Sequence, residues 1–210
     1  MISIMNQLEQ RLLEDINWRI SELSIIKSIP YLFPFNTKQK EVLLRYSIPA
    51  MYALWEGFVS TAFTIYTSEI NKLNLPIDSI SIIIVANDID IKYHLQNGRT
   101  IFDKKVKLIK ELDRYRKSEL KLSAQLPTES NITFKVINNI LYRFNLPLLA
   151  EEIFKNRIDK LVMIRNIIAH GESHIVTQDV INELSEVVIE LMNELFEILI
   201  SSFEGKTFLK

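Results

Sequence analysis

The stretch from Met51 to Tyr66 limits the fold of this chain more than any other part of the sequence. On a helix, its apolar residues would cover most of the circumference (Met51, Tyr52, Leu54, Trp55, Phe58, Val59, Ala62, Phe63, Ile65 and Tyr66). A helix that is apolar on nearly every side must be surrounded by other elements. We therefore expect this segment to be the central helix of the hydrophobic core.

This central helix is expected to begin after Asn36 or Thr37, either of which can cap its N-terminus, and to end near Asn74. Pro49 lies inside it and is expected to bend it, because a proline removes one backbone hydrogen bond of a helix. Glu56 lies in its most apolar part. Because an unpaired buried carboxylate is costly, Glu56 is expected to lie on a polar seam or to face a site.

Amphipathic patterns predict further helices on both sides of the central one. They cover residues 3–28, 103–121, 134–144, 151–169 and 177–203. Gly171 is the expected C-terminal cap of the fourth of these helices, and Thr177 is the expected N-terminal cap of the last. Pro30 and Pro34 are expected to bracket an irregular connector, because a proline disfavours helix in the residue before it.

Between residues 75 and 133 the sequence predicts less. Residues 79–88 (SISIIIVAND) contain enough β-branched side chains to form a short strand, and the same run would also suit a buried helical turn. Asn97-Gly98 indicates a turn, and residues 126–133 (LPTESNIT) indicate a loop. For residues 79–88 the choice between strand and helix stays open.

Composition agrees with a helical protein. Hydrophobic residues make up 48% and charged residues 24% of the 210 residues, with only four glycines to form tight turns. The sequence contains no internal repeat, no low-complexity segment and no clear linker. We expect one all-α domain over residues 1–210, a helical bundle with an irregular middle segment.

Other features of the composition exclude classes of protein. The chain has no cysteine, which excludes disulfides, thiolate zinc sites and cysteine nucleophiles. Its apolar runs are shorter than a membrane span, and its first 15 residues acquire acids and amides too early for a secretory signal. We therefore expect a cytoplasmic protein without a membrane partner.

Charge is unevenly distributed along the chain, although the net charge is only −1. Arg99 to Lys121 holds nine basic and four acidic residues, whereas Glu172 to Glu204 holds eight acids and no lysine or arginine. Two solvated helix faces that attract each other would explain this pattern. The alternative is a patch that steers phosphate groups toward a site, formed by Lys104, Lys105, Lys107, Lys110 and Arg114.

The run from Ile158 to Gly171 (IDKLVMIRNIIAHG) brings together an arginine, an amide and an imidazole at the end of a predicted helix. Asn166 and His170 are four residues apart, so they share a helix face about 6 Å apart along the axis. Arg165 precedes His170 by five residues and points roughly 140° away from it. This spacing favours a groove at a helix–helix seam, within one subunit or between two, over a pocket on one helix.

These residue types suit RNA cleavage by internal attack. The ribose 2′-hydroxyl must lose a proton as it attacks phosphorus, the leaving 5′-oxygen must gain one, and a histidine can serve either step. The guanidinium of Arg165 would stabilise the extra negative charge on phosphorus, and Asn166 would orient the imidazole or bind a phosphate oxygen. Such chemistry needs no metal, and it is confined to RNA because the nucleophile belongs to the ribose.

A structural interpretation of the same residues stays open, in which His170 only caps its helix and Arg165 only links helices. His174 is expected to be a surface-loop histidine, and His94 has no evident partner. The chain has no Glu-x-x-His pair, no phosphate-binding glycine loop and no Gly-x-Ser-x-Gly turn, which disfavours the enzymes built on those motifs. We expect neither a metal nor a cofactor.

Three blocks of the sequence resemble one known family. Residues 165–171 (RNIIAHG), preceded by IDKLV, closely resemble the signature helix of HEPN-domain proteins. Residues 52–59 (YALWEGFV) are similar to the second-helix signature of the HEPN-like nuclease branch found in prokaryotic toxin and defence loci. Residues 130–132 (SNI), followed by apolar residues at helical spacing, resemble the middle segment of that branch. The blocks come in the family's order, and the resemblance as a whole covers about residues 40–200.

The resemblance implies an all-α bundle that dimerises and pairs two Arg–His motifs in one cleft. It also implies metal-independent cleavage of RNA, often tRNA or mRNA, with Arg165 and His170 catalytic, Asn166 supporting and Glu56 a neighbour of the cleft. Some HEPN toxins carry a tyrosine two residues after the histidine, which a partner antitoxin modifies. Glu172 stands there in this chain, so that mode of regulation is not supported.

The function that we expect from the sequence is therefore an endoribonuclease that acts as a toxin or phage-defence effector. Its expected partners are RNA, a second copy of the chain, and an antitoxin or defence-system protein, with no DNA. The alternatives are a catalytically inactive module of the same fold that binds RNA or protein, and a purely structural helical bundle.

Overall fold

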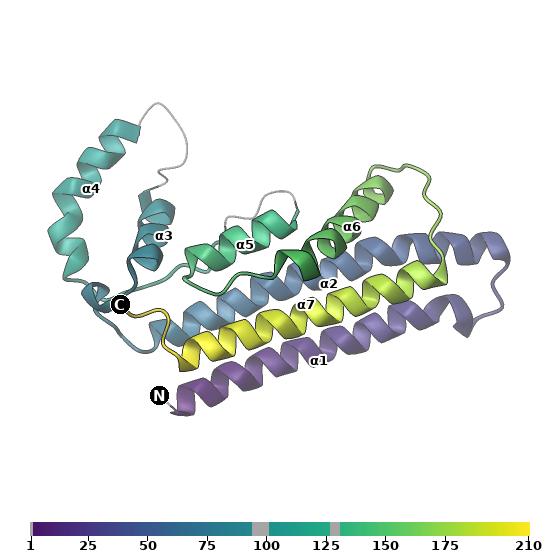
Figure 1. Ribbon diagram of the computed structural model, residues 1–210, viewed down its shortest axis with the longest axis horizontal. Helices are drawn as coiled ribbons and strands as arrows, with labels where there is room; N and C mark the ends of the chain where they lie inside the picture. Colours follow the sequence, from purple (N-terminus) through teal and green to yellow (C-terminus); the bar gives the residue numbers. More distant parts are fainter. Residues whose placement is uncertain (1, 94–100, 127–130) are drawn as a thin grey trace.

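Three long helices run side by side in the computed structural model, which describes residues 2–93, 101–126 and 131–210. They are α1 (Ile2–Leu32), α2 (Thr37–Asn71) and α7 (Gln178–Glu204), and each contacts the other two (Figure 1). No strand is found in the described part of the chain, so the predicted all-α bundle is confirmed. None of the described helices has the apolar length needed to cross a membrane.

The middle of α2 forms the centre of the core, as its sequence predicts. The ten apolar residues named above between Met51 and Tyr66 are all buried, none of them more than 7% exposed. The helix begins with a reciprocal cap, in which Asn36 Oδ1 accepts from the Gln39 N–H at 3.0 Å and Gln39 Oε1 accepts from the Asn36 N–H at 2.9 Å. From this cap, α2 runs through Pro49 as one continuous helix.

The connector between α1 and α2 is shorter than predicted, because α1 extends past Pro30 to Leu32. The prediction that the helix ends near residue 28 is wrong. Proline has a backbone φ that suits a helix and costs mainly one hydrogen bond, and Pro30 is buried against the body of the protein. Packing therefore keeps the last turn of α1 helical, and only residues 33–36 form the connector.

The open choice for residues 79–88 is settled in favour of helix. A short 3-10 turn, η1 (Ile77–Ser79), precedes the helix α3 (Ile82–Tyr93). Ile80 pairs with Leu209 only as a single isolated bridge, so no ladder develops to hold a strand. Without a partner strand, the preference of β-branched residues for extended backbone is too weak to decide the structure.

The basic helix α4 spans Ile101–Arg116, so both of its predicted ends are wrong. It begins two residues before Asp103, and beyond Arg116 the chain pairs with the backbone after α2. The Leu120 N–H donates to the Leu75 carbonyl at 2.8 Å, which replaces further helical hydrogen bonds. The predicted turn at Asn97-Gly98, His94 and residues 127–130 of the predicted loop at 126–133 lie outside the described residues.

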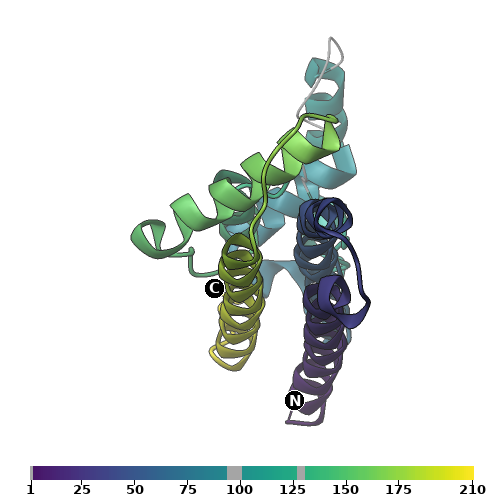
Figure 2. The same cartoon turned by 90° about the vertical axis from the view of Figure 1, so that its right-hand side faces the viewer.

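The shorter helices form a second layer on one side of the long helices. Figure 1 shows them in the order α4, α3, α5 (Phe134–Arg143) and α6 (Glu151–Ala169). Helix α6 packs on α2 and α7, and it crosses the long helices at a steep angle (Figure 2). The start of α5 lies against α6, where the Phe134 N–H donates to Asp159 Oδ1 at 3.4 Å. The predicted bounds of α6 are confirmed, and those of α5 are confirmed to within one residue.

Two acids of α7 pair with α6. Glu190 binds Arg157 and Glu183 binds Lys160, with N–O distances of 2.5 and 2.6 Å. The hydrogen bond from Arg157 lowers the pKa of the Glu190 carboxyl. Since α4 and α7 lie apart in both views (Figures 1 and 2), attraction between the basic and acidic segments does not explain the uneven charge.

A buried arginine ties α1 to α2 beside Gly57. Arg19 is only 6% exposed, and its guanidinium binds Asp15 at 2.7 Å, the Leu54 carbonyl at 3.0 Å and Thr61 Oγ1 at 3.3 Å. A Cβ atom on residue 57 would lie 2.7 Å from Nη1 of Arg19. The missing side chain of Gly57 therefore makes room for the buried guanidinium.

Replacing Gly57 by alanine is expected to lower the free energy of unfolding by about 1–3 kcal/mol, because the new methyl group displaces Arg19 from its partners. The loss should exceed the gain of about 1 kcal/mol that alanine brings to a helix. Urea denaturation measures the change. Ser60→Ala, on the exposed face of the same helix, is the control and should change stability by less than about 0.5 kcal/mol. An unchanged or raised stability of Gly57→Ala would contradict the packing argument.

Candidate functional site

Helix α6 ends at the residues that the sequence singles out. The His170 N–H donates to the Asn166 carbonyl at 3.0 Å, and the chain then reverses at Gly171, whose φ is +80°. The N–H groups of Gly171 and Glu172 donate back to the carbonyls of Ile168 and Ile167, which satisfies the end of the helix. The predicted cap at Gly171 is confirmed, and it leaves the His170 side chain exposed at the corner of α6.

Arg165 is half-buried and held by three different parts of the chain. Its Nη1 atom donates to Asn131 Oδ1 and to Asn166 Oδ1, both at 2.8 Å. Its Cζ atom lies 4.9 Å from the centre of the Tyr52 ring, close enough for a cation–π contact. The guanidinium is therefore fixed between α2, the segment before α5, and α6.

Tyr52 lies beneath Arg165 and is almost fully buried. Its hydroxyl accepts from the Ile132 N–H at 2.6 Å and donates to Glu56 Oε1 at 3.1 Å. Burial raises the pKa of Tyr52 to about 12, with a smaller increase from Glu56, against the opposing effects of the Ile132 N–H and Arg165. Tyr52 thus stays protonated near neutral pH, where it can hold Arg165 and Glu56 in position but cannot act as a base.

Asn166 joins the two faces of α6. It shares a face with His170, four residues on, and its side-chain oxygen accepts from Arg165 on the neighbouring face. Within the part of the chain that the structure describes, Glu56 forms no hydrogen bond or ion pair with Arg165 or His170, and it reaches the site through the hydroxyl of Tyr52. The structure thus brings Arg165, Asn166 and, through Tyr52, Glu56 into one polar network, with His170 exposed one turn beyond.

Two residues of this network were not predicted as site residues. The sequence predicts Tyr52 as a residue of the apolar core, and it places Asn131 in a loop that also carries one block of the family resemblance. One signal in the sequence points to such partners. Arg165 has no acidic residue three or four positions away on its own helix, so a half-buried guanidinium there needs further partners on other elements.

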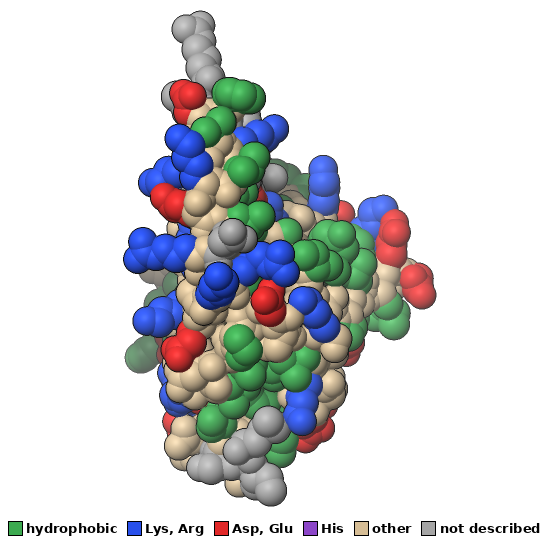
Figure 3. Space-filling view, turned by 90° about the vertical axis from the view of Figure 1, so that its left-hand side faces the viewer, with side chains coloured by type: hydrophobic (Ala, Val, Ile, Leu, Met, Phe, Trp, Pro, Cys, Tyr) green, Lys and Arg blue, Asp and Glu red, His purple; other side chains and the backbone are tan. Residues whose placement is uncertain are grey.

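The basic side chains of α4 lie away from this network. Lys105, Lys107, Lys110 and Arg114 are exposed and Lys104 is half-exposed. Figure 3 shows lysine and arginine side chains gathered over this end of the molecule, with apolar side chains between them. Since α4 and α6 lie at opposite ends of the second layer, the structure does not bring these lysines to Arg165.

The donor groups of the described residues do not assemble into a metal site. No group of three His, Asp or Glu side chains among them is placed to hold one ion. His174 is half-exposed in the loop after α6. The polar network around Arg165 offers a guanidinium and amides, which are groups that bind phosphate and carboxylate oxygens.

Two features characterise this protein. It is an all-α bundle, and it holds an arginine fixed between helices with an exposed histidine five residues later. The chain matches the family described as HEPN_MAE_28990-like HEPN over residues 8–208, nearly its whole length. It therefore belongs to the HEPN domains, and the predicted family is confirmed. Membership supports an RNA-related, nuclease-like module. Comparisons with curated proteins and with solved structures found no match.

Proposed function

We propose that the protein is a metal-independent endoribonuclease in which Arg165 and His170 act on a phosphodiester of RNA. The observation that carries this proposal is the fixed guanidinium of Arg165, bound by two amides and the Tyr52 ring, at the end of α6 where His170 is exposed. A guanidinium held in this way is preorganised for an anion, because its position is set before substrate arrives.

The reaction needs one proton removed and one supplied. The 2′-oxygen of the ribose forms a bond to the adjacent phosphorus as its proton passes to a base, and the bond from phosphorus to the 5′-oxygen breaks as that oxygen gains a proton. His170 serves as base or acid, and Arg165 binds the phosphate oxygens that gain charge in the transition state. The products are a 2′,3′-cyclic phosphate and a 5′-hydroxyl.

A second copy of the chain would complete the site. Arg165 and His170 lie on different faces of α6, and one histidine cannot at the same moment remove one proton and supply the other. Met163 is 53% exposed and lies seven residues before His170, on the same face of α6. We infer a homodimer that buries this face of α6 and pairs two copies of the motif. Sedimentation should give twice the chain mass of 24.6 kDa, and a fully active monomer would contradict the pairing.

The biological role that fits such an enzyme is that of a toxin or phage-defence effector in the cytoplasm. Cleavage of cellular RNA arrests growth, so a protein that binds and restrains the enzyme would be its expected partner. The substrate must be RNA, because the attacking group is the ribose 2′-hydroxyl, which DNA lacks.

Incubation of the purified protein with RNA in EDTA tests the proposal. We expect cleavage without added metal, and none of the same sequence made as DNA. If RNA stays intact at high protein concentration and yet binds, the protein is an interaction module of the HEPN fold and not an enzyme. If RNA neither binds nor is cut, the polar network around Arg165 is structural.

Neutralising the basic face of α4 tests whether it steers RNA to the site. Replacing Lys105, Lys107 and Lys110 by glutamine should lower kcat/KM about tenfold or more at low salt and leave kcat unchanged, because the charges accelerate encounter and not chemistry. The rate should also depend less steeply on salt. Replacement of Lys38 and Lys40, exposed or half-exposed on α2, is the control. Equal losses in both variants would remove the steering role.

Asn131 should matter for catalysis because it fixes Arg165. Asn131→Ala removes one charge-assisted hydrogen bond, of about 1.5–3 kcal/mol, and should lower kcat about ten- to hundredfold with little effect on KM. Steady-state kinetics measures kcat and KM, and the thermal unfolding midpoint shows whether the variant is as stable as the wild type. Asn156→Ala, an exposed asparagine on α6, is the control. Wild-type kcat in Asn131→Ala would show that Arg165 does not depend on this contact.

A further inference from the structure

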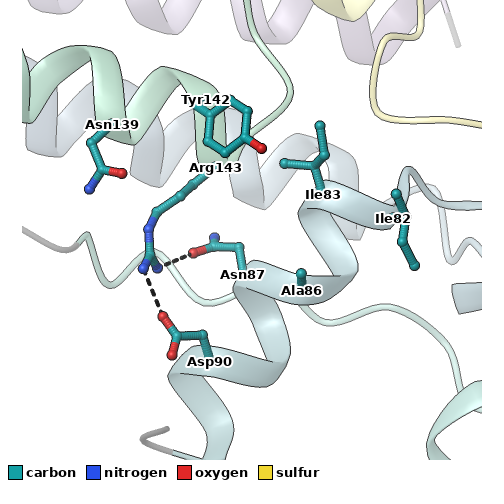
Figure 4. Close-up of a pocket in the computed structure, with 8 residues that line it drawn as sticks. All are labelled: Ile82, Ile83, Ala86, Asn87, Asp90, Asn139, Tyr142 and Arg143. Atoms are coloured by element: carbon teal, nitrogen blue, oxygen red, sulfur yellow. Dashed lines mark hydrogen bonds and ion pairs between the residues drawn. The ribbon is translucent and has the colours of Figure 1, made fainter. Parts of the chain in front are cut away.

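A pocket of about 480 Å³ opens between α3 and α5, and none of the residues that line it belongs to the network around Arg165. It is lined by one face of α3, residues 82–90, and by the last two turns of α5, residues 139–143 (Figure 4). A volume of this size is typical of sites for small molecules. It lies at the opposite end of α5 from Asn131, the partner of Arg165.

The charge inside the pocket is balanced. Arg143 reaches across from α5, and its guanidinium donates to Asn87 Oδ1 at 2.9 Å and to Asp90 Oδ2 at 2.8 Å on α3 (Figure 4). Because Asp90 pairs with the guanidinium, the pocket is not arranged to bind a phosphate group. The partly exposed guanidinium instead offers a flat surface on which an uncharged ring can stack.

The other polar groups are placed to recognise a ring by its edge. The Tyr142 side chain is 58% exposed, and Asn139 on the same face of α5 is also exposed. Within the described residues, neither the Asn139 amide nor the Tyr142 hydroxyl has a hydrogen-bond partner. An amide offers one donor and one acceptor together, and an aromatic ring offers a stacking surface, which is the combination that proteins use for single-stranded nucleobases.

The position of the pocket agrees with such a ligand. Residues 139–143 lie about 8–14 Å along α5 from its first residue, which is next to α6. Beyond α3 in the same layer lies the basic helix α4 (Figure 1). A single strand of RNA with one phosphate at Arg165 would therefore pass the pocket on its way to the lysines of α4.

We propose that this pocket binds one nucleobase of the RNA substrate and gives cleavage a base preference at a position away from the scissile bond. The inference rests on the proposed ribonuclease function for the source of the base. The chemistry of recognition, a stacked uncharged ring read by an amide, stands on the contacts of the pocket alone.

Titration of the full-length protein with AMP, CMP, GMP, UMP and ribose 5-phosphate tests the binding step. In NMR spectra we expect at least one nucleotide to shift the amide signals of residues 82–90 and 139–143, and ribose 5-phosphate to leave them unchanged. Tyr142→Ala should lower the affinity for that nucleotide at least tenfold. Tyr46 is a similarly exposed tyrosine on α2, and Tyr46→Ala should leave the affinity unchanged. Shifts of equal size with ribose 5-phosphate, or none with any nucleotide, would overturn the proposal.

Cleavage of an RNA pool of randomised sequence separates this proposal from the function on which it rests. The wild-type protein should prefer one base at a fixed distance from the cut, and Tyr142→Ala and Asn139→Ala should lose that preference while still cutting RNA. Cleavage with the preference unchanged in both variants would overturn the pocket assignment and leave the ribonuclease standing. If the protein binds a nucleotide at the pocket but cuts no RNA, the ribonuclease function is overturned and the pocket assignment stands.

Discussion

Replacing His170 by alanine is expected to lower the rate of RNA cleavage by about 10²- to 10⁴-fold, the range that a positioned acid or base contributes. The side chain is exposed at the end of α6 and has no hydrogen bond within the described residues, so its removal should cost almost no stability. A loss of activity in a protein that unfolds at the wild-type temperature would therefore report on chemistry. Single-turnover cleavage of a labelled RNA measures it.

His174→Ala is the matched control for this experiment. His174 lies four residues further on, in the loop after α6, and is half-exposed. We expect it to retain activity within a few-fold of the wild type. If His170→Ala cleaves RNA as fast as the wild type, or if His174→Ala is the variant that fails, the assignment of His170 is wrong.

Replacing Arg165 by alanine is expected to lower kcat by about 10²- to 10³-fold, the loss typical of removing one group that stabilises transition-state charge. Arg165→Lys should recover little of this activity. A lysine keeps the positive charge but lacks the planar guanidinium, whose Nη1 atom binds Asn131 and Asn166 while its Cζ atom lies over the Tyr52 ring. Kinetics of both variants on one RNA substrate checks the prediction.

The same substitution tests the biological role. Expression of the wild-type protein should arrest growth, and expression of Arg165→Ala at the same level should not. Arg157→Ala removes an arginine of α6 whose partner is Glu190 of α7, and it is the control. Equal growth with wild type and Arg165→Ala would remove the claim that the protein is a toxin. Growth arrest by both would mean that toxicity does not depend on Arg165.

The sequence predicts the helix that carries the site better than it predicts any other part of the chain. Both ends of α6 and its cap at Gly171 are set by local signals, which are the apolar spacing and a glycine that can adopt a positive φ. Helical geometry alone predicts that Arg165 and His170 lie on different faces of α6. The structure agrees, since the guanidinium is half-buried and the imidazole is exposed. Local rules were sufficient because the helix ends where its own sequence changes.

The partners of Arg165 could not be predicted by the same rules. Tyr52 precedes Arg165 by more than a hundred residues, and its ring is buried like the core residues around it. Asn131 lies in a segment that the sequence indicates only as a loop. Contacts between distant segments depend on how helices pack, and helical spacing within one segment carries no information about them.

The wrong end predicted for α1 and the undecided structure of residues 79–88 have the same origin. Pro30 continues a helix because its ring is buried, and residues 82–88 are helical because no strand lies beside them. Both outcomes depend on neighbours in space. Local preferences, about 3 kcal/mol against proline inside a helix and about 1 kcal/mol for β-branched residues in strands, give way to packing of this kind.

A synthetic RNA with one cleavage site tests the central claim most directly, that Arg165 and His170 promote attack by the ribose 2′-hydroxyl. Two forms of the RNA are compared, one intact and one with hydrogen in place of the 2′-hydroxyl at the scissile nucleotide. Each is incubated with the wild-type protein in EDTA, and the ends of the products are identified by mass spectrometry. We predict a 2′,3′-cyclic phosphate from the intact RNA and no cut in the substituted one. A 3′-hydroxyl end, or cleavage of the substituted RNA, would contradict it.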